Sequence, residues 1–168
     1  PGLDASSNFM PKGLAYCSGS QAAEVEVDIE TGDVTILNYV AVQDSGRLIN
    51  PLIVDGQVAG GITHGIGNAL FERLYHDETG QPLTTTLAEY LLPTAPHIPS
   101  LKIKYSETLC TKNPIGVKGI GEGGTVPVPA VIISAVENAL EPFGVVIDQT
   151  PIDPSKIVDL VRQSVPIS

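Results

Sequence analysis

A single carboxylate, Glu122, lies among five glycines in the segment GVKGIGEGGT at residues 116–125. Glycine allows the backbone to approach another molecule closely, although ordering it costs more entropy than ordering any other residue. The apolar residues Val117 and Ile120, and the very apolar segment that follows, are not typical of a solvent-exposed linker. We therefore interpret this segment as a loop that packs against something flat or bulky, with Glu122 pointing at it.

The chemistry that Glu122 could carry out is proton abstraction. A carboxylate buried beside an apolar helix is suited to act as a general base near neutral pH. A lone glutamate in a loop is more often solvated, because carboxylates are rarely buried without a partner. The residue types around Glu122 thus permit a base and do not require one.

A second glycine cluster lies in the helical pattern DGQVAGGITHGIGNALFERL, which contains Gly56, Gly60, Gly61, Gly65 and Gly67. Each glycine inside a helix costs roughly 1 kcal/mol relative to alanine, so these glycines need a compensating role. Gly56, Gly60 and Gly67 fall on the same helix face as His64. Either this face forms a close crossing with His64 hydrogen-bonded in the core, or a ligand lies along it and accepts from His64. The glycine loop around Glu122 favours the ligand.

Other catalytic patterns are incomplete in the sequence. Residues 119–124 match G-x-G-x-x-G, but Pro127 and Pro129 delay the helix that a dinucleotide fold requires. The three histidines lack metal-ligand spacing, so we predict no metal held by protein ligands. Asp44 and Arg47 in QDSGR are interpreted as a turn and an ion pair, because Asp-Ser-Gly readily forms turns.

The composition limits the class of protein. With 168 residues, 42% of them hydrophobic, the chain can form one domain with a sizeable core. The net charge of −10 argues against nucleic-acid and anionic-membrane partners, and the longest apolar run is too short to span a bilayer. Two cysteines without motif spacing indicate a reduced, cytoplasmic setting. The sparse charges and the first residue, Pro1, indicate a piece of a larger protein whose surface other protein covers.

The elements that must position these residues are predicted from hydrophobic periodicity. Residues 1–22 are rich in Ser, Gly and Pro and are expected to form an irregular arm. The expected elements are a β-hairpin within 23–42, a strand at 101–107, and helices at 51–74, at 127–141 and from Pro154 onward, with Asp153 as N-cap. The helix at 127–141 is almost entirely apolar and is therefore expected to be buried. The fold class is α+β, a hairpin and further strands packed with about three helices.

Four motifs, taken in order, resemble the C-terminal end of the molybdenum-binding large subunit of the xanthine oxidase family. They are AEVEVDIETGDVTIL, VQDSGRLINPLIVDGQVAGGITHGIGNALFE, AEYLLPTAPHIPSL and NPIGVKGIGEGGT. The family includes xanthine dehydrogenase, aldehyde oxidoreductase and aerobic carbon monoxide dehydrogenase. The resemblance implies that residues 23–168 form the C-terminal portion of a larger molybdenum cofactor-binding domain.

The resemblance also implies roles for single residues. Glu122 matches the family's glutamate, which faces the molybdenum and acts as a base on the metal's hydroxyl ligand. The residues just before it match a stretch that lies against the pterin, and these are Lys118, Gly119, Ile120 and Gly121. His64 stands where many relatives have a glutamine that contacts the metal's oxo group or the pterin, so a hydrogen-bond donor is kept there.

The cofactor implied by the resemblance is molybdenum–molybdopterin, in the cytosine dinucleotide form, with iron–sulfur clusters and FAD on partner subunits or domains. The expected partners are the remainder of the large subunit, an iron–sulfur subunit, an FAD subunit and a small substrate, either an aldehyde, an N-heterocycle or CO. The chain is expected to supply the base and part of the molybdopterin site, and to be inactive alone. The alternative is a non-catalytic cofactor-binding or assembly module of the same fold; the intact Glu122 favours the enzyme.

Overall fold

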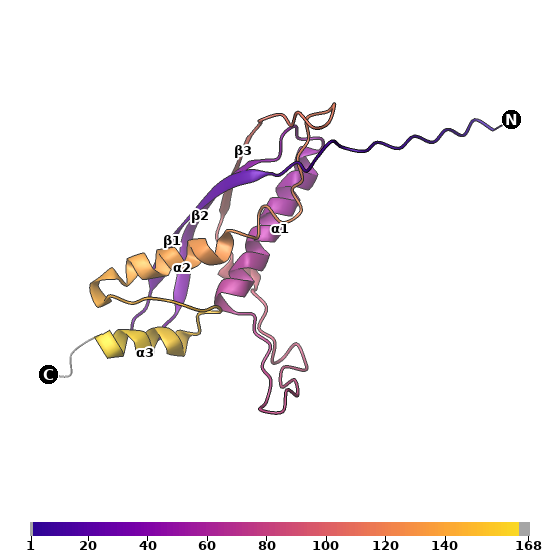
Figure 1. Cartoon of the computed structure of the whole chain (residues 1–168). Helices are drawn as coiled ribbons and strands as arrows, with labels where there is room; N and C mark the ends of the chain where they lie inside the picture. The colour runs from indigo at the N-terminus through magenta and orange to yellow at the C-terminus, as the bar shows by residue number, and fades with distance from the viewer. Residues whose placement is uncertain (1, 165–168) are drawn as a thin grey trace.

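A three-stranded sheet organises the computed structural model, which describes residues 2–164. Its strands are β1 (Ser18–Val27), β2 (Val34–Asp44) and β3 (Leu101–Ser106), in that spatial order. β1 and β2 form the predicted antiparallel hairpin, and β3 pairs with β2 in the parallel direction. Helix α1 (Pro51–Leu70) and the long connection after it provide the crossover that a parallel pair requires (Figure 1).

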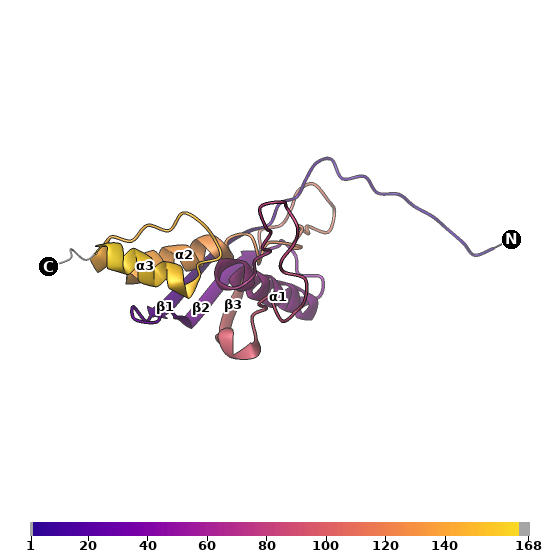
Figure 2. The same ribbon diagram turned by 90° about the horizontal axis from the view of Figure 1, so that it is seen from below.

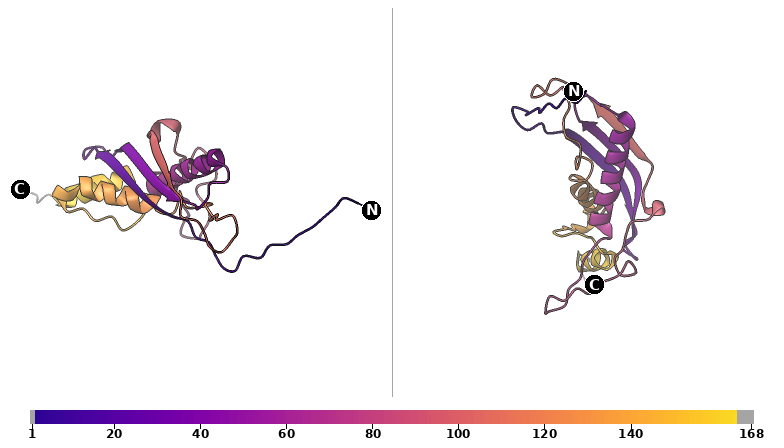
Figure 3. Two further views of the ribbon diagram at one scale, coloured as in Figure 1. Left: turned by 90° about the horizontal axis from the view of Figure 1, so that it is seen from above. Right: turned by 90° about the vertical axis from the view of Figure 1, so that its right-hand side faces the viewer.

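The helices gather on one face of this sheet (Figure 3). α1 packs there together with α2 (Val128–Ala139), and α3 (Pro154–Ser164) adds Ile157 and Val161 to the same core. Short 3-10 helices span Ala95–His97 and Glu141–Phe143. The opposite face of β2 leaves Leu37, Val40 and Val42 exposed. The fold class is α+β, as predicted.

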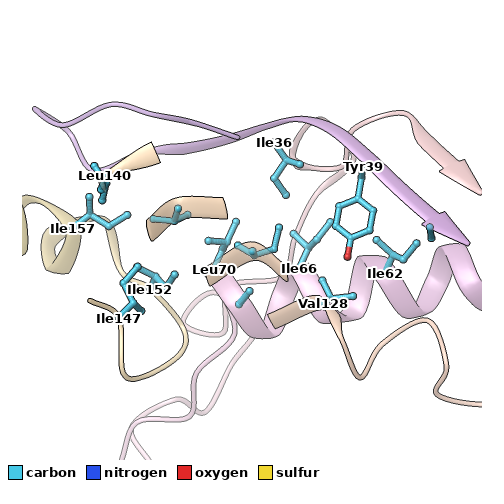
Figure 4. Close-up of a cluster of buried hydrophobic side chains, with 14 of the residues drawn as sticks. Ile36, Tyr39, Ile62, Ile66, Leu70, Val128, Leu140, Ile147, Ile152 and Ile157 are labelled. Atoms are coloured by element: carbon cyan, nitrogen blue, oxygen red, sulfur yellow. The ribbon is translucent and has the colours of Figure 1, made fainter. Parts of the chain in front are cut away.

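The core fills the space between the sheet and the helices (Figure 4). Tyr39 of β2 lies there beside Ile62 and Ile66 of α1, and its hydroxyl donates to Oε1 of Gln21 at 2.6 Å. The core continues toward α3 through the buried side chains of Leu140, Ile147, Ile152 and Ile157. This continuous core holds α1, α2 and the sheet in a fixed arrangement, which is what a site built between them requires.

Two predicted boundaries differ from the structure. α1 ends at Leu70 rather than near residue 74, because the N–H groups of Phe71 and Glu72 both turn back to the carbonyl of Gly67. β1 begins at Ser18, within the predicted arm of residues 1–22, since pairing with β2 extends that far. The chain before β1 runs away from the body of the molecule (Figure 2).

One prediction about the later helices needs correction and one is confirmed. α2 is fully buried only along Val128, Ile132 and Val136, because a helix that covers a sheet presents only one face to it. α3 begins at Pro154 as predicted, and Asp153 occupies the position before it, because its carbonyl accepts from the N–H groups of Lys156 and Ile157. The side chain of Asp153 pairs with Arg73 at 3.4 Å. Within residues 2–164, no helix is both long and apolar enough to cross a membrane.

Candidate functional site

The glycine loop is anchored to the end of β2. The N–H of Lys118 donates to the carbonyl of Ser45 at 2.8 Å, and the N–H of Arg47 donates to the carbonyl of Gly116 at 3.1 Å. Gly116 has a φ of 76°, a left-handed conformation that a side chain would strain. The loop therefore begins in a fixed position although so much of it is glycine.

Beyond this anchor, Glu122 faces an open cavity of about 570 Å³. The cavity lies between the loop and the start of β1, and it is lined by Ala15, Tyr16, Cys17, Ser18, Gly19, Gln43, Gly119, Gly121, Glu122, Gly123, Val126 and Pro127. Glu122 itself is exposed. Its carboxylate is therefore accessible to a bound molecule, which a base acting on a ligand requires.

Four glycines, two on α1 and two in the loop, have room for a side chain. A Cβ added at Gly56, Gly60 or Gly121 would meet nothing within 4 Å, and at Gly119 only a carbonyl oxygen at 3.8 Å. None of the four has a positive φ, so backbone conformation does not require glycine either. We call Gly56, Gly60, Gly119 and Gly121 the open glycine surface. Its lack of side chains is what close approach by another molecule would require.

Gln57 joins the two parts of the open glycine surface. Its side chain, on α1, donates to the carbonyl of Gly121 at 2.6 Å and so holds the loop against the helix. The loop also leaves donors free: within residues 2–164, the N–H groups of Ile120, Gly121 and Glu122 have no acceptor. Three consecutive free donors beside backbone without side chains suit a ligand that carries acceptor atoms.

The glycines of α1 serve two different purposes. Gly61 lies against Gly124 and Thr125, and Gly65 lies against Val128, so these two provide a close crossing as the packing interpretation proposed. Gly67, which the sequence predicts on the ligand face, is buried against the side chain of Glu72. Of the helix face predicted to contact a ligand, only Gly56, Gly60 and His64 are exposed.

The structure brings some of the predicted site residues together and separates others. Glu122, Gly119 and Gly121 line the cavity, whereas Ile120 packs partly into the core. His64 is exposed on α1 and does not line the cavity. Sequence reasoning missed Gln57, although it lies two helical turns before His64 and hence on the same helix face.

Lys118 points away from this cavity. Its Nζ lies 3.0 Å from Oδ2 of Asp44, and both side chains are nearly buried. The ion pair predicted for Asp44 thus exists, but its partner is Lys118 rather than Arg47. Hydrogen bonds from the N–H of Gly46, then from Thr108 and Lys118, hold the pKa of Asp44 well below its usual range. No group of three acidic, histidine or cysteine side chains suitable for a metal occurs within residues 2–164.

Comparison with known proteins identifies relatives of this arrangement. The model of the molybdopterin cofactor-binding domain family matches residues 2–99, which include the hairpin and α1. The chain is 39% identical over 158 residues to the nicotine 6-hydroxylase large subunit of Paenarthrobacter nicotinovorans, covering 94% of this chain and 19% of that protein. It is 33% identical to the carbon monoxide dehydrogenase large chain of Afipia carboxidovorans, covering 83% and 17%.

Solved structures agree with these relatives. The crystal structure of quinoline 2-oxidoreductase from Pseudomonas putida 86 superposes with a TM-score of 0.84 at 41% identity, over 86% of this chain and 18% of that one. A Cu,Mo-containing CO dehydrogenase gives a TM-score of 0.82 at 30% identity. The chain therefore spans about a fifth of the length of the relatives it matches.

Proposed function

Because this chain belongs to the molybdopterin cofactor-binding domain family, as part of a xanthine oxidase-type molybdenum-binding subunit, we propose that it supplies a general base and part of the cofactor site. The proposed base is Glu122. One observation carries the proposal: Glu122 lies on an open cavity that also exposes backbone without side chains, at Gly119 and Gly121. We further propose that residues 23–168 form the C-terminal portion of the cofactor-binding domain.

The residues present fit a flat, fused-ring group such as molybdopterin. Rings can lie against the open glycine surface, because a Cβ added at three of its four glycines would meet nothing within 4 Å. The free N–H groups of Ile120, Gly121 and Glu122 match the acceptor atoms at a pterin edge. We propose that these N–H groups and the open glycine surface hold the cofactor, with Lys118 anchoring the loop and His64 as a further donor on the same face of α1. When bound, the cofactor supplies the redox chemistry.

The role proposed for Glu122 is to accept a proton at a carboxylate oxygen. Gly121 and Gly123 on either side of it let the carboxylate approach a bound group without obstruction. Val126 and Pro127 line the same cavity and make one side of it apolar. A base held at hydrogen-bonding distance from its target contributes typically 10²- to 10⁴-fold to a rate.

The finer features of the enzyme are part of the same proposal. We propose the cytosine dinucleotide form of the cofactor, with iron–sulfur clusters and FAD on partner subunits. Relatives named as a large subunit, a large chain and subunit gamma support an assembly of several subunits. The expected substrate classes are aldehydes, N-heterocycles and CO, and we propose an N-heterocycle, because the names of two relatives contain nicotine and quinoline. Two unpaired cysteines, Cys17 and Cys110, support a cytoplasmic location.

The substitution Glu122→Gln in the complete, molybdenum-loaded enzyme tests the proposal. Glutamine keeps the shape of the side chain and removes its basicity. We therefore expect turnover to fall by about 10²-fold or more, which is the typical effect of losing a general base, while molybdenum is retained. The exposed Glu141, in the 3-10 helix at Glu141–Phe143, provides a matched control as Glu141→Gln. Near-normal turnover of Glu122→Gln would exclude the role as base and favour a non-catalytic, cofactor-holding module.

A further inference from the structure

Apart from Tyr39, three consecutive residues at the end of β2 are the only buried side chains with polar groups among residues 2–164. They are Gln43, Asp44 and Ser45, which are 2%, 8% and 3% exposed. Burying polar groups costs free energy unless they are hydrogen-bonded, so such a cluster needs a purpose. All three residues contact the glycine loop that carries Glu122. We call them the buried polar triplet.

Asp44 and Ser45 hold the loop at Lys118. Oδ2 of Asp44 accepts from Nζ of Lys118 at 3.0 Å, and its Oδ1 accepts from the N–H groups of Gly46 at 2.8 Å and Thr108 at 3.1 Å. The carbonyl of Ser45 accepts from the N–H of Lys118 at 2.8 Å. Lys118 is therefore fixed at both its backbone and its ammonium group, four residues before Glu122.

Gln43 lies against the loop on the other side of Glu122. Its Nε2 donates to the carbonyl of Ser18 at 3.0 Å, which fixes the amide. A Cβ added at Gly123 would lie 3.0 Å from this nitrogen and 2.9 Å from Sγ of Cys17, so Gly123 sits directly against both side chains. Glu122 thus lies between Lys118, which is hydrogen-bonded to Asp44 and to the carbonyl of Ser45, and Gly123, which packs against Gln43.

We propose that Asp44, acting through Lys118, and Gln43, acting through Gly123, are positioning residues that hold the carboxylate of Glu122 at the cavity. The proposal rests on the proposed role of Glu122 as base. Glycine-rich backbone cannot fix a side chain by its own conformational preferences, so rigidity must come from its neighbours. A misplacement of about 1 Å at a reacting group can reduce the rate about 10²-fold, which makes such an anchor consequential.

The test uses the complete, molybdenum-loaded enzyme with the variants Asp44→Asn and Gln43→Met. We expect each variant to retain molybdenum and to lose about 10- to 100-fold in kcat with little change in KM. Hydrogen exchange followed by mass spectrometry should show the hydrogen-bonded amides of the loop, those of residues 116–119 and of Gly123, exchanging about tenfold faster, as local opening predicts. Gln43→Met provides the test if Asp44→Asn does not fold.

Two further variants define what overturns the proposal. Asp153→Asn breaks the exposed ion pair with Arg73 and should change neither kcat nor exchange in the loop. Asp44→Asn combined with Lys118→Met should lose no more than Asp44→Asn alone, because the two residues act as a unit. Wild-type kcat with unchanged loop exchange, or loss of molybdenum in step with kcat, would overturn the positioning role. If Glu122→Gln is fully active, the proposed base is wrong instead, and the exchange data still report whether the triplet anchors the loop.

Discussion

Gly65 of α1 lies directly against the side chain of Val128 in the first turn of α2. A methyl group at Gly65 would overlap Val128, with its two γ carbons only 2.7 and 2.9 Å away. Gly61, one turn earlier, has the same relationship to Gly124 and Thr125 of the glycine loop. The crossing of α1 with α2 is therefore what brings the loop onto α1, where Gln57 reaches it.

This contact predicts opposite effects for two glycines of one helix. Gly65→Ala should lower the free energy of unfolding of the 168-residue chain, because overpacking costs roughly 1–3 kcal/mol and exceeds the gain in helix propensity of about 1 kcal/mol. Gly60→Ala has nothing within 4 Å and should raise the free energy of unfolding by up to about 1 kcal/mol. Urea unfolding of both variants gives the comparison. Equal effects in the two variants would contradict the assignment of Gly65 to the crossing.

The open glycine surface predicts a different effect in the complete enzyme. Gly60→Leu should leave the isolated chain at least as stable as wild type, since leucine is the better helix former and the site is exposed. In the complete large subunit the same side chain should obstruct the bound cofactor and reduce the molybdenum content. Metal analysis of the purified enzyme provides the measurement. A variant that assembles with a full complement of molybdenum would show that this face does not contact the cofactor.

The openness of the site predicts that the 168-residue chain does not retain cofactor by itself. Binding pockets normally bury most of a ligand, whereas Glu122 is exposed and the open glycine surface covers only one side of a ring system. Purified without the rest of its subunit, the chain should contain no stoichiometric molybdenum and show no hydroxylase activity. Inductively coupled plasma mass spectrometry gives the answer, and a one-to-one metal content would mean that these residues enclose the cofactor alone.

Asp44 predicts a pH dependence of stability. Its pKa in the folded chain is depressed, chiefly by the hydrogen bond from the N–H of Gly46. The stabilisation is therefore present above the unfolded-state pKa of about 4 and is lost as the pH falls toward the folded-state pKa. Asp44→Asn should cost about 1–3 kcal/mol at neutral pH, and this difference from wild type should shrink below about pH 4. Urea unfolding at several pH values provides the check; a difference that does not change with pH would assign the loss to packing.

Local patterns predicted most of the fold. The alternation of apolar and polar residues predicted the hairpin and the strand at 101–107, and the pair Asp153-Pro154 predicted the start of α3. Each of these signals lies within a few residues of the chain. The parallel direction of β3 did not follow, since alternation is the same in parallel and antiparallel strands. The predicted burial of α2 was too extensive, because an apolar composition does not show how many faces of a helix pack against other elements.

The site was predictable where a motif marks backbone geometry and unpredictable where distant residues meet. The glycine loop placed Glu122 at the cavity edge, and the helical spacing identified an exposed face around Gly60. The partner of Asp44 could not be found, because Lys118 lies 74 residues away whereas Arg47 lies within the same turn. Gln57 was missed for the same reason, as its acceptor, the carbonyl of Gly121, lies 64 residues away.

The parallel pairing of β3 with β2 has a consequence for the order in which the site forms. Lys102 of β3 reaches Asn38 of β2 across 64 residues, whereas a tight turn joins β1 to β2. Closing a long loop costs entropy before its contacts repay it, so we expect the hairpin to form early and β3 to join it late. The loop with Glu122 follows β3 in the sequence. During synthesis, the end of β2 is therefore complete long before the loop that it must hold has left the ribosome, and the proposed base takes its position among the last events of folding.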